Sequence, residues 1–159
     1  MAFKSTILVV EDILKSRTLY EDLLGCKVEA DFGIYNVGFE GGFALYQKTL
    51  FTELIGQNEI AAKAHNLAVY FEFGDIVAVR DKVVANGFEL VHDMKEQPWG
   101  QRVLRFYDYD NHIVEIGEDM DQVLLNMQQA GMSESDIAQK TGYSEADVIR
   151  MLKNLVQVE

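Results

Sequence analysis

The stretch QPWGQRVLRFYDYDNHIVEIGE, residues 97–118, contains two runs rich in β-branched and aromatic residues, separated by the polar segment DYDN. Such runs favour strands, whereas Asp and Asn favour tight turns and Asn tolerates a left-handed backbone. The pattern therefore predicts a hairpin with its turn at residues 108–111. One carboxylate, Glu115, lies among apolar residues of the second strand. Because a buried carboxylate without a partner is costly, we expect Glu115 to be a ligand contact, a metal ligand or half of an ion pair.

The predicted turn also determines which side chains share a face of the hairpin. With residues 108–111 in the turn, Tyr107 lies opposite His112, and Leu104 lies opposite Glu115. Successive side chains of a strand point to opposite faces. The face that carries Glu115 is then predicted to contain Arg102, Leu104, Phe106 and Ile113 as well. Two other interpretations stay open. In one, Leu104, Phe106 and Ile113 are simply core residues. In the other, Arg102 forms a structural ion pair with Glu115.

One order of elements occurs twice along the chain. The strand-like run TILVVED is followed by Asp12 and Gly25, which can begin and end a helix. The run LAVYFEF is followed in the same way by Asp75 and Gly87, at nearly the same spacing. Further strand-like segments, separated by glycines or turn residues, follow each helix. A repeat of this kind indicates two copies of one βαβββ unit.

The predicted fold class is α+β. The two βαβββ units span about residues 3–48 and 67–118, and together they form one domain, residues 1–118, whose sheets enclose a cavity. Residues 119–159 differ in character, because three amphipathic segments separated by glycines predict an all-helical C-terminal extension of about three helices.

The helical extension contains two helix-start signals. Ser133 with Asp136, and Ser144 with Asp147, resemble capping boxes in which Asp replaces the usual Glu. The segment resembles a helix-turn-helix core, but residues 119–159 carry seven acidic and three basic side chains, which opposes contact with phosphates. We therefore expect the extension to pack on the body, cap a pocket or extend a dimer interface, and not to bind nucleic acid.

Composition limits the function further. The formal net charge of −12 opposes binding to nucleic acid or to an anionic membrane surface. Cys26 is the only cysteine, so no disulfide can form within the chain. The first fifteen residues lack the pattern of a signal peptide, and no apolar stretch is long enough to cross a membrane. These features predict a cytoplasmic protein.

Taken together, the two βαβββ units, the D-x-x-x-S-x-x-x-Y-x-x-x-L-G pattern at 12–25 and the hairpin PWGQRVLRFYDYDNHIVEIGE at 98–118 resemble the vicinal oxygen chelate superfamily. This superfamily contains glyoxalase I, extradiol dioxygenases, fosfomycin-resistance enzymes and bleomycin-binding resistance proteins. The hairpin often carries D-P-D-G in the family, and this chain has Asp108-Tyr109-Asp110-Asn111. The resemblance implies curved sheets around a small-molecule cavity, and it implies a homodimer.

The resemblance also implies positions for metal ligands, on the first and last strands of each unit. Glu115 matches the ligand position of the last strand. The other three positions fall at Leu45 (or Ala44 with a slip of one residue), Ser5 and Ala68. Catalytic metal sites usually need three protein ligands, so we expect neither a metal nor another cofactor. If a metal is bound, His65 is the expected partner of Glu115.

These inferences predict a protein that binds a small, partly apolar organic molecule. The leading expectation is that it catalyses no reaction on this molecule. Trp99 is the only tryptophan and follows the only proline, which fits a lid or stacking surface. The predicted ligand contacts are Glu115, Trp99, Arg102, Phe106 and Leu45. The alternative is a metal-dependent lyase or isomerase resembling lactoylglutathione lyase, or a dioxygenase, with a non-standard site using Glu115. A ligand-sensing regulator is a third reading.

Overall fold

The computed structural model describes residues 4–56 and 59–156 of the chain. The first unit contains the elements β1 (Thr6–Val10), α1 (Ile13–Arg17), the π-helical turn η1 (Thr18–Leu23), β2 (Val28–Asp31), β3 (Asn36–Phe39) and β4 (Phe43–Gln47). Its four strands form one sheet in the order β1-β4-β3-β2, in which β1 and β4 are parallel. Asp12 begins α1 by accepting a hydrogen bond from the backbone N of Lys15, as the sequence predicted.

The second unit repeats this arrangement. It contains β5 (Ala68–Phe73), α3 (Ile76–Ala85), β6 (Leu90–Glu96), β7 (Arg102–Tyr107) and β8 (Ile113–Glu118). The sheet order is β5-β8-β7-β6, with β5 and β8 parallel. Asp75 caps α3, and Gly87 follows the helix with a φ of 75°. The α+β class and the repeated order of elements are therefore confirmed. Helix α2 (Lys48–Ile55) lies between the units in sequence.

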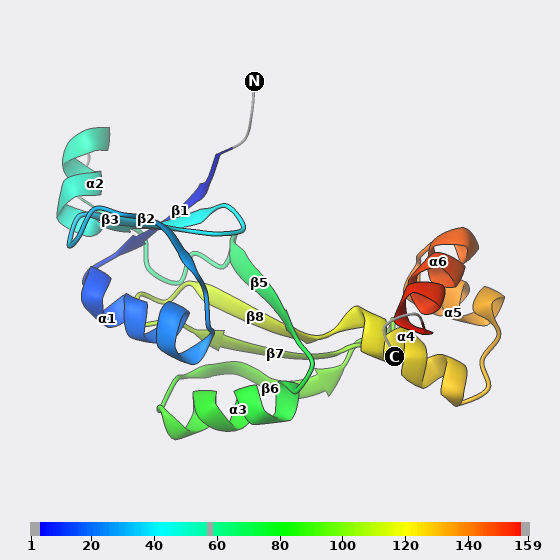
Figure 1. The fold of residues 1–159 in the computed structure, drawn as a ribbon. Helices are drawn as coiled ribbons and strands as arrows, with labels where there is room; N and C mark the ends of the chain where they lie inside the picture. Colours follow the sequence, from blue (N-terminus) through cyan, green and yellow to red (C-terminus); the bar gives the residue numbers. More distant parts are fainter. Residues whose placement is uncertain (1–3, 57–58, 157–159) are drawn as a thin grey trace.

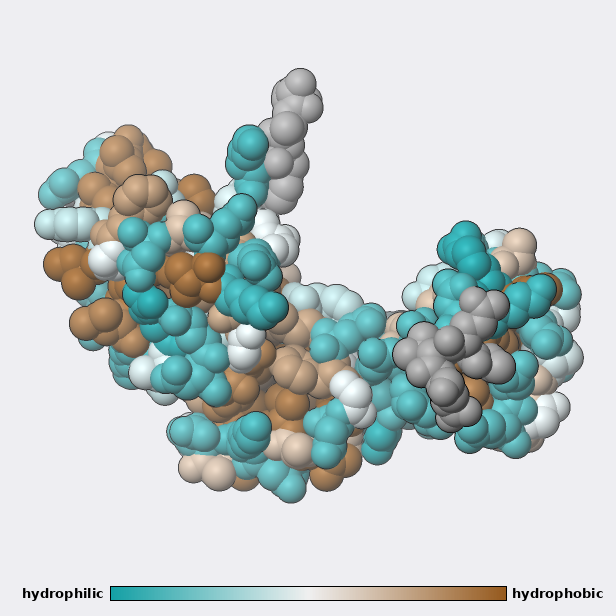
Figure 2. Space-filling view, viewed as in Figure 1, coloured by the Kyte–Doolittle hydropathy of each residue, from teal (hydrophilic) through white to brown (hydrophobic). Residues whose placement is uncertain are grey.

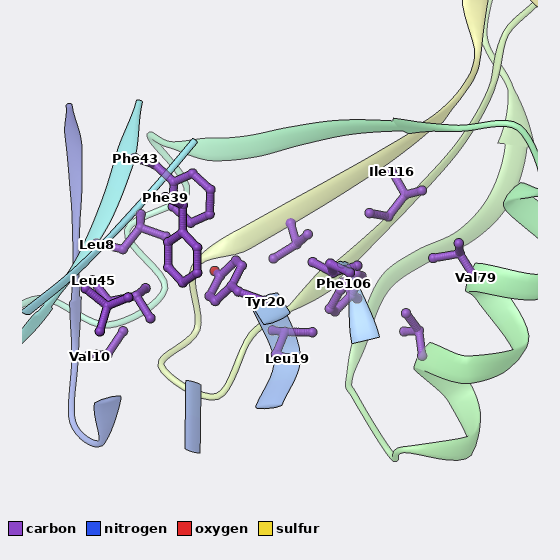
Figure 3. Packing of buried hydrophobic residues seen from close by; sticks show 14 of the residues in the cluster. Leu8, Val10, Leu19, Tyr20, Phe39, Phe43, Leu45, Val79, Phe106 and Ile116 are labelled. Atoms are coloured by element: carbon purple, nitrogen blue, oxygen red, sulfur yellow. The ribbon is translucent and has the colours of Figure 1, made fainter. Parts of the chain in front are cut away.

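One hydrophobic core joins the two units. Figure 3 shows Leu8 and Leu45 of the first sheet on one side, Phe106 and Ile116 of the second sheet on the other, and Tyr20 between them. Aromatic residues continue the contact, because the ring of Phe43 on β4 lies edge-on to Phe71 on β5, with 6.0 Å between ring centres. Burial of these apolar faces is the main force that holds the units together.

The β7–β8 hairpin differs from the prediction by one residue. Asp108 closes the loop through its backbone N, which donates to the carbonyl of His112 at 3.0 Å. Asn111 adopts a left-handed conformation with a φ of 67°, as is usual at the end of a three-residue hairpin loop. Arg105 therefore lies opposite Glu115, and the prediction that Leu104 does so is wrong. A slip of one residue exchanges the two faces of a strand.

The C-terminal extension forms the three predicted helices, α4 (Met120–Gln129), α5 (Glu134–Thr141) and α6 (Glu145–Val156). Figure 1 shows them at the end of the second sheet where β8 leads into α4. They have their own apolar cluster, against which Trp99 of the body packs. Ser133 and Ser144 cap their helices as predicted, since each hydroxyl accepts a backbone hydrogen bond from the residue three positions later. None of the helices in the described part of the chain is long and apolar enough to cross a membrane.

Candidate functional site

The second sheet has one face in the core and one face away from it. Leu104, Phe106, Val114 and Ile116 are fully buried on the core side. The alternate residues form the opposite surface, which we call the open face: Ala68, Tyr70, Glu72, Val103, Arg105, Tyr107, Ile113, Glu115 and Gly117. Val103 and Tyr107 on this face are also buried. Strand pairing places Glu115 at its centre, between Tyr70 on β5 and Arg105 on β7.

Glu115 is held by an ion pair on this face. The Nε of Arg105 donates to Glu115 Oε2 at 2.6 Å, and Nη1 of the same guanidinium lies 2.8 Å from His92 Nε2. Because arginine can only donate, Nε2 of His92 must accept, and its Nδ1 then carries the proton and donates to the carbonyl of Asp93 at 2.9 Å. Both members of the ion pair keep part of their surface, with side-chain exposures of 25% for Arg105 and 19% for Glu115. The carboxylate is thus fixed in position and still reachable from solvent.

Arg102 lies elsewhere, because the corrected register moves it away from Glu115. It forms a two-pronged ion pair with Glu118, at 3.0 and 2.6 Å. This hydrogen-bonded contact lowers the pKa of Glu118. The structure also places Leu45 and Phe106 in the core, where neither has any exposed surface.

Gln101 organises the part of the site next to Trp99. Its side chain is 3% exposed. The indole Nε1 of Trp99 donates to Gln101 Oε1 at 3.0 Å, while Gln101 Nε2 donates to the Tyr70 hydroxyl and to the carbonyl of Glu118, both at 2.7 Å. The Tyr70 hydroxyl then donates to Glu72 at 2.6 Å. Because an indole N–H can only donate, this network also fixes the orientation of the amide.

Gly117 provides the space for this network. A Cβ atom at Gly117 would lie 2.6 Å from Gln101 Nε2 and 2.7 Å from the Tyr70 hydroxyl. The amide and the tyrosine ring therefore lie across β8 only because residue 117 has no side chain. Sequence reasoning missed Gln101, and its only signal was an uncharged polar residue next to the single tryptophan at the start of a strand.

These residues border a pocket of about 440 Å³ between the open face and the helical extension. The body contributes Tyr70, Glu72, Trp99, Gln101 and Glu115, and the extension contributes Met120, Thr141, Gly142 and Tyr143. Two of the residues predicted as ligand contacts, Glu115 and Trp99, thus lie on the wall of one pocket. That the extension caps a pocket was one of the alternatives left open by the sequence, whereas the part that forms the wall, the α5–α6 turn, depends on how the helices dock.

His65 lies at another part of the open face. Its Nε2 is 2.7 Å from the hydroxyl of Tyr107, and its ring stacks on the Tyr107 ring at 5.6 Å between centres. Tyr107 is paired with Ile113, two positions along β8 from Glu115. His65 therefore contacts Tyr107, whereas Glu115 contacts Arg105. The structure does not bring His65 and Glu115 into contact with each other.

The donor set does not fit the metal site of the superfamily. Glu115 is paired with an arginine, and its neighbour on β5 is Tyr70, whose proton goes to Glu72. On the first sheet, Ala44 lies opposite Ile7 on the face away from the core. Among the residues that the structure describes, no three His, Cys, Asp or Glu side chains lie close enough to hold a metal ion.

Comparison with solved structures supports the fold. A protein of unknown function from Agrobacterium tumefaciens is 40% identical, with a TM-score of 0.66 over 75% of this chain and 94% of the other. A lactoylglutathione lyase from the same organism is 18% identical, with a TM-score of 0.57 and coverages of 75% and 94%. A fosfomycin resistance protein from Listeria monocytogenes is 17% identical, with a TM-score of 0.55 and coverages of 75% and 93%. The last two show similarity of fold alone.

No curated protein matches the chain. The glyoxalase-like domain matches residues 3–121, which includes both βαβββ units and ends at the start of α4. The helices after residue 121 lie outside the match. Because well over half of the sequence matches, the chain belongs to the glyoxalase-like domain family within the vicinal oxygen chelate superfamily.

Proposed function

We propose that this protein binds a small, partly apolar organic molecule in the pocket between the open face and the helical extension, without a metal ion. The observation that carries this proposal is that Glu115 and Trp99 line the same pocket. A pocket of about 440 Å³ is within the usual range for small-molecule sites, and an aromatic wall with a few fixed polar groups is typical of them.

Glu115 is proposed to contact the ligand, because it is fixed by Arg105 and remains accessible. Replacing Glu115 with glutamine keeps the size of the side chain and keeps an oxygen that can accept the hydrogen bond from Arg105 Nε. We therefore expect Glu115→Gln to melt within about 2 °C of the wild type and to lose most of the stabilisation that a bound ligand gives. A thermal-shift screen of metabolites and aromatic antibiotics measures both quantities.

One control and a second pocket variant accompany this experiment. Glu29→Gln changes an exposed carboxylate on β2 and should leave ligand stabilisation intact. Trp99→Ala should weaken binding and also lower the melting temperature, because Trp99 packs against the cluster of the extension. A large loss of melting temperature in Glu115→Gln without ligand would show that the carboxylate serves stability.

The alternative of a metal-dependent lyase, isomerase or dioxygenase predicts about one Zn, Ni, Mn or Fe per purified chain by elemental analysis.

We also propose that the protein forms a homodimer. Large apolar side chains are exposed around the first sheet and α2, namely Phe32, Ile34, Tyr35, Leu54 and Ile55. Figure 2 shows hydrophobic surface gathered around α2 and the nearby end of the first sheet. Extended apolar surface of this kind often marks an interface. Light scattering at micromolar concentration should give twice the 18.0 kDa mass of one chain, and a monomer mass would contradict the proposal.

A further inference from the structure

The helical extension supplies one wall of the pocket. Gly142 ends α5 in a left-handed conformation with a φ of 79°, and the chain turns there to place Tyr143 at the pocket. Tyr143 is 38% exposed, and its backbone N approaches Thr141 Oγ1 at 3.4 Å. Since the family match ends at residue 121, this wall is a feature of this chain and not of the matched domain.

The wall is docked against the loop that carries Trp99. The Trp99 ring packs on the apolar cluster of the extension, and Lys140 Nζ lies 3.5 Å from Glu96 at the end of β6. Gly100 comes so close to the side chains of Met127 and Lys140 that a Cβ atom there would overlap with Met127. These contacts hold the α5–α6 turn beside the open face.

The hydrogen-bond donors on the pocket wall are almost all used within the protein. The indole N–H of Trp99 goes to Gln101, and the Tyr70 hydroxyl goes to Glu72. The Thr141 hydroxyl donates to the carbonyl of Ile137 at 2.7 Å. The Gln101 amide is also fully engaged. What remains for a ligand is chiefly ring faces and carboxylate oxygens, which suits a positive group and not an anion.

The charged side chains around the pocket also favour a positively charged ligand. Glu72 is exposed on the open face, and Asp121 lies near it at the start of α4. Burial raises the pKa of Tyr143, and the negative charges of Glu72 and Asp121 raise it further. Within residues 4–56 and 59–156, no lysine, arginine or histidine forms an ion pair with either carboxylate. The positive Arg105 is neutralised by Glu115.

We propose that the pocket selects organic cations, in which a quaternary or protonated amine attached to a flat apolar group is held by the rings of Tyr70, Trp99 and Tyr143 and by the Glu72 carboxylate. The proposal rests on the proposed function and specifies its ligand class. Ring faces attract cations through their negative quadrupole, and each favourable ring changes affinity by about two- to fivefold at a partly exposed site.

The test uses three small probes that share one phenyl ring and differ in charge. Benzyltrimethylammonium carries a positive charge, benzyl alcohol is neutral, and benzenesulfonate is negative. Trp99 is the only tryptophan and lies on the pocket wall, so its fluorescence reports binding directly. We expect saturable quenching by benzyltrimethylammonium at millimolar concentration, at least fivefold weaker binding of the other two probes, and loss of affinity in high salt.

Variants separate the rings from the charge. Tyr143→Ala should weaken binding of the cation about two- to fivefold, and Tyr143→Phe should retain it because the ring face remains. Glu72→Gln should weaken the cation and leave benzyl alcohol unchanged. The matched controls, Tyr35→Ala and Glu53→Gln, lie on exposed surface of the first unit or α2 and should change nothing.

Each contrary result has a definite meaning. Equal or tighter binding of benzyl alcohol or benzenesulfonate would overturn the cation preference, as would unchanged affinity in Glu72→Gln. If benzyl alcohol binds and Glu115→Gln weakens it, the pocket still binds small molecules and only the ligand class is wrong. If none of the three probes quenches Trp99, the cation inference fails, and the thermal-shift screen decides the proposed function independently.

Discussion

Replacing Asp108 with alanine is expected to lower the free energy of unfolding by about 3–5 kcal/mol. Asp108 is a 6% exposed residue at the end of β7. Its Oδ2 accepts hydrogen bonds from the Tyr20 hydroxyl at 2.9 Å and from His112 Nδ1 at 2.8 Å. Its Oδ1 accepts from the backbone N of Asp110 and of His112. The substitution would leave all four donors without their acceptor, including a tyrosine hydroxyl with no exposed surface.

The cost is large because this contact also joins the two units. Tyr20 belongs to η1 of the first unit, whereas Asp108 and His112 flank the hairpin loop of the second. Urea denaturation followed by circular dichroism measures the loss. Asp22→Ala, which removes an exposed carboxylate from the same helical turn as Tyr20, serves as the control and should stay within about 0.5 kcal/mol of the wild type. A similar loss in both variants would show that the buried network is not the cause.

The same network gives the wild type a characteristic pH dependence. Burial lowers the pKa of His112, but the hydrogen bond and charge of Asp108, with the charge of Asp110, outweigh burial and raise it above 6.5. A raised histidine pKa contributes stability that is complete below the unfolded value and is lost as pH rises through the folded value. Stability should therefore fall as pH rises above 6.5, and Asp108→Ala should flatten this fall. His92→Gln, which keeps the Asp108–His112 pair, should retain it.

The repeated units and the helix caps could be predicted because each depends on neighbours in sequence. Asp12, Asp75, Ser133 and Ser144 accept hydrogen bonds from residues three positions away, so local pattern is enough. The three C-terminal helices follow from the same local signals.

The register of the hairpin could not be predicted in this way. Val103 and Leu104 are both fully buried, although they lie on opposite faces of β7, so alternation gave no clear choice of core side. The choice depended on whether the loop began at residue 108 or 109, and Asn111 allows both. Arg102 and Arg105 lie three positions apart, so an arginine was available to pair with Glu115 in either register. The wall formed by Tyr143 was beyond sequence reasoning, because it arises from docking of helices on a distant loop.

Replacing Gly117 with alanine is expected to abolish ligand binding, with a loss of affinity of at least tenfold. The new Cβ would lie 2.6 Å from Gln101 Nε2, 2.7 Å from the Tyr70 hydroxyl and 2.9 Å from Tyr70 Cε2. To make room for the new methyl group, Gln101 must break the hydrogen bond between its buried amide and the carbonyl of Glu118. Tyr70 must therefore leave the pocket wall, and Trp99 loses the acceptor of its N–H. Overpacking of this kind also costs about 1–3 kcal/mol of stability.

The chain offers a matched control for this substitution in the first unit. Gly38 occupies a half-buried position within β3, where a Cβ would lie 3.7 Å from the Ala30 side chain, an ordinary contact. Gly38→Ala should therefore retain ligand binding and change stability by less than about 1 kcal/mol. Trp99 fluorescence distinguishes the two variants, because loss of its fixed contact with Gln101 should shift the emission of Gly117→Ala only. Unchanged emission and affinity in Gly117→Ala would mean that Tyr70 and Gln101 do not shape the pocket, since the crowding acts directly on those two side chains.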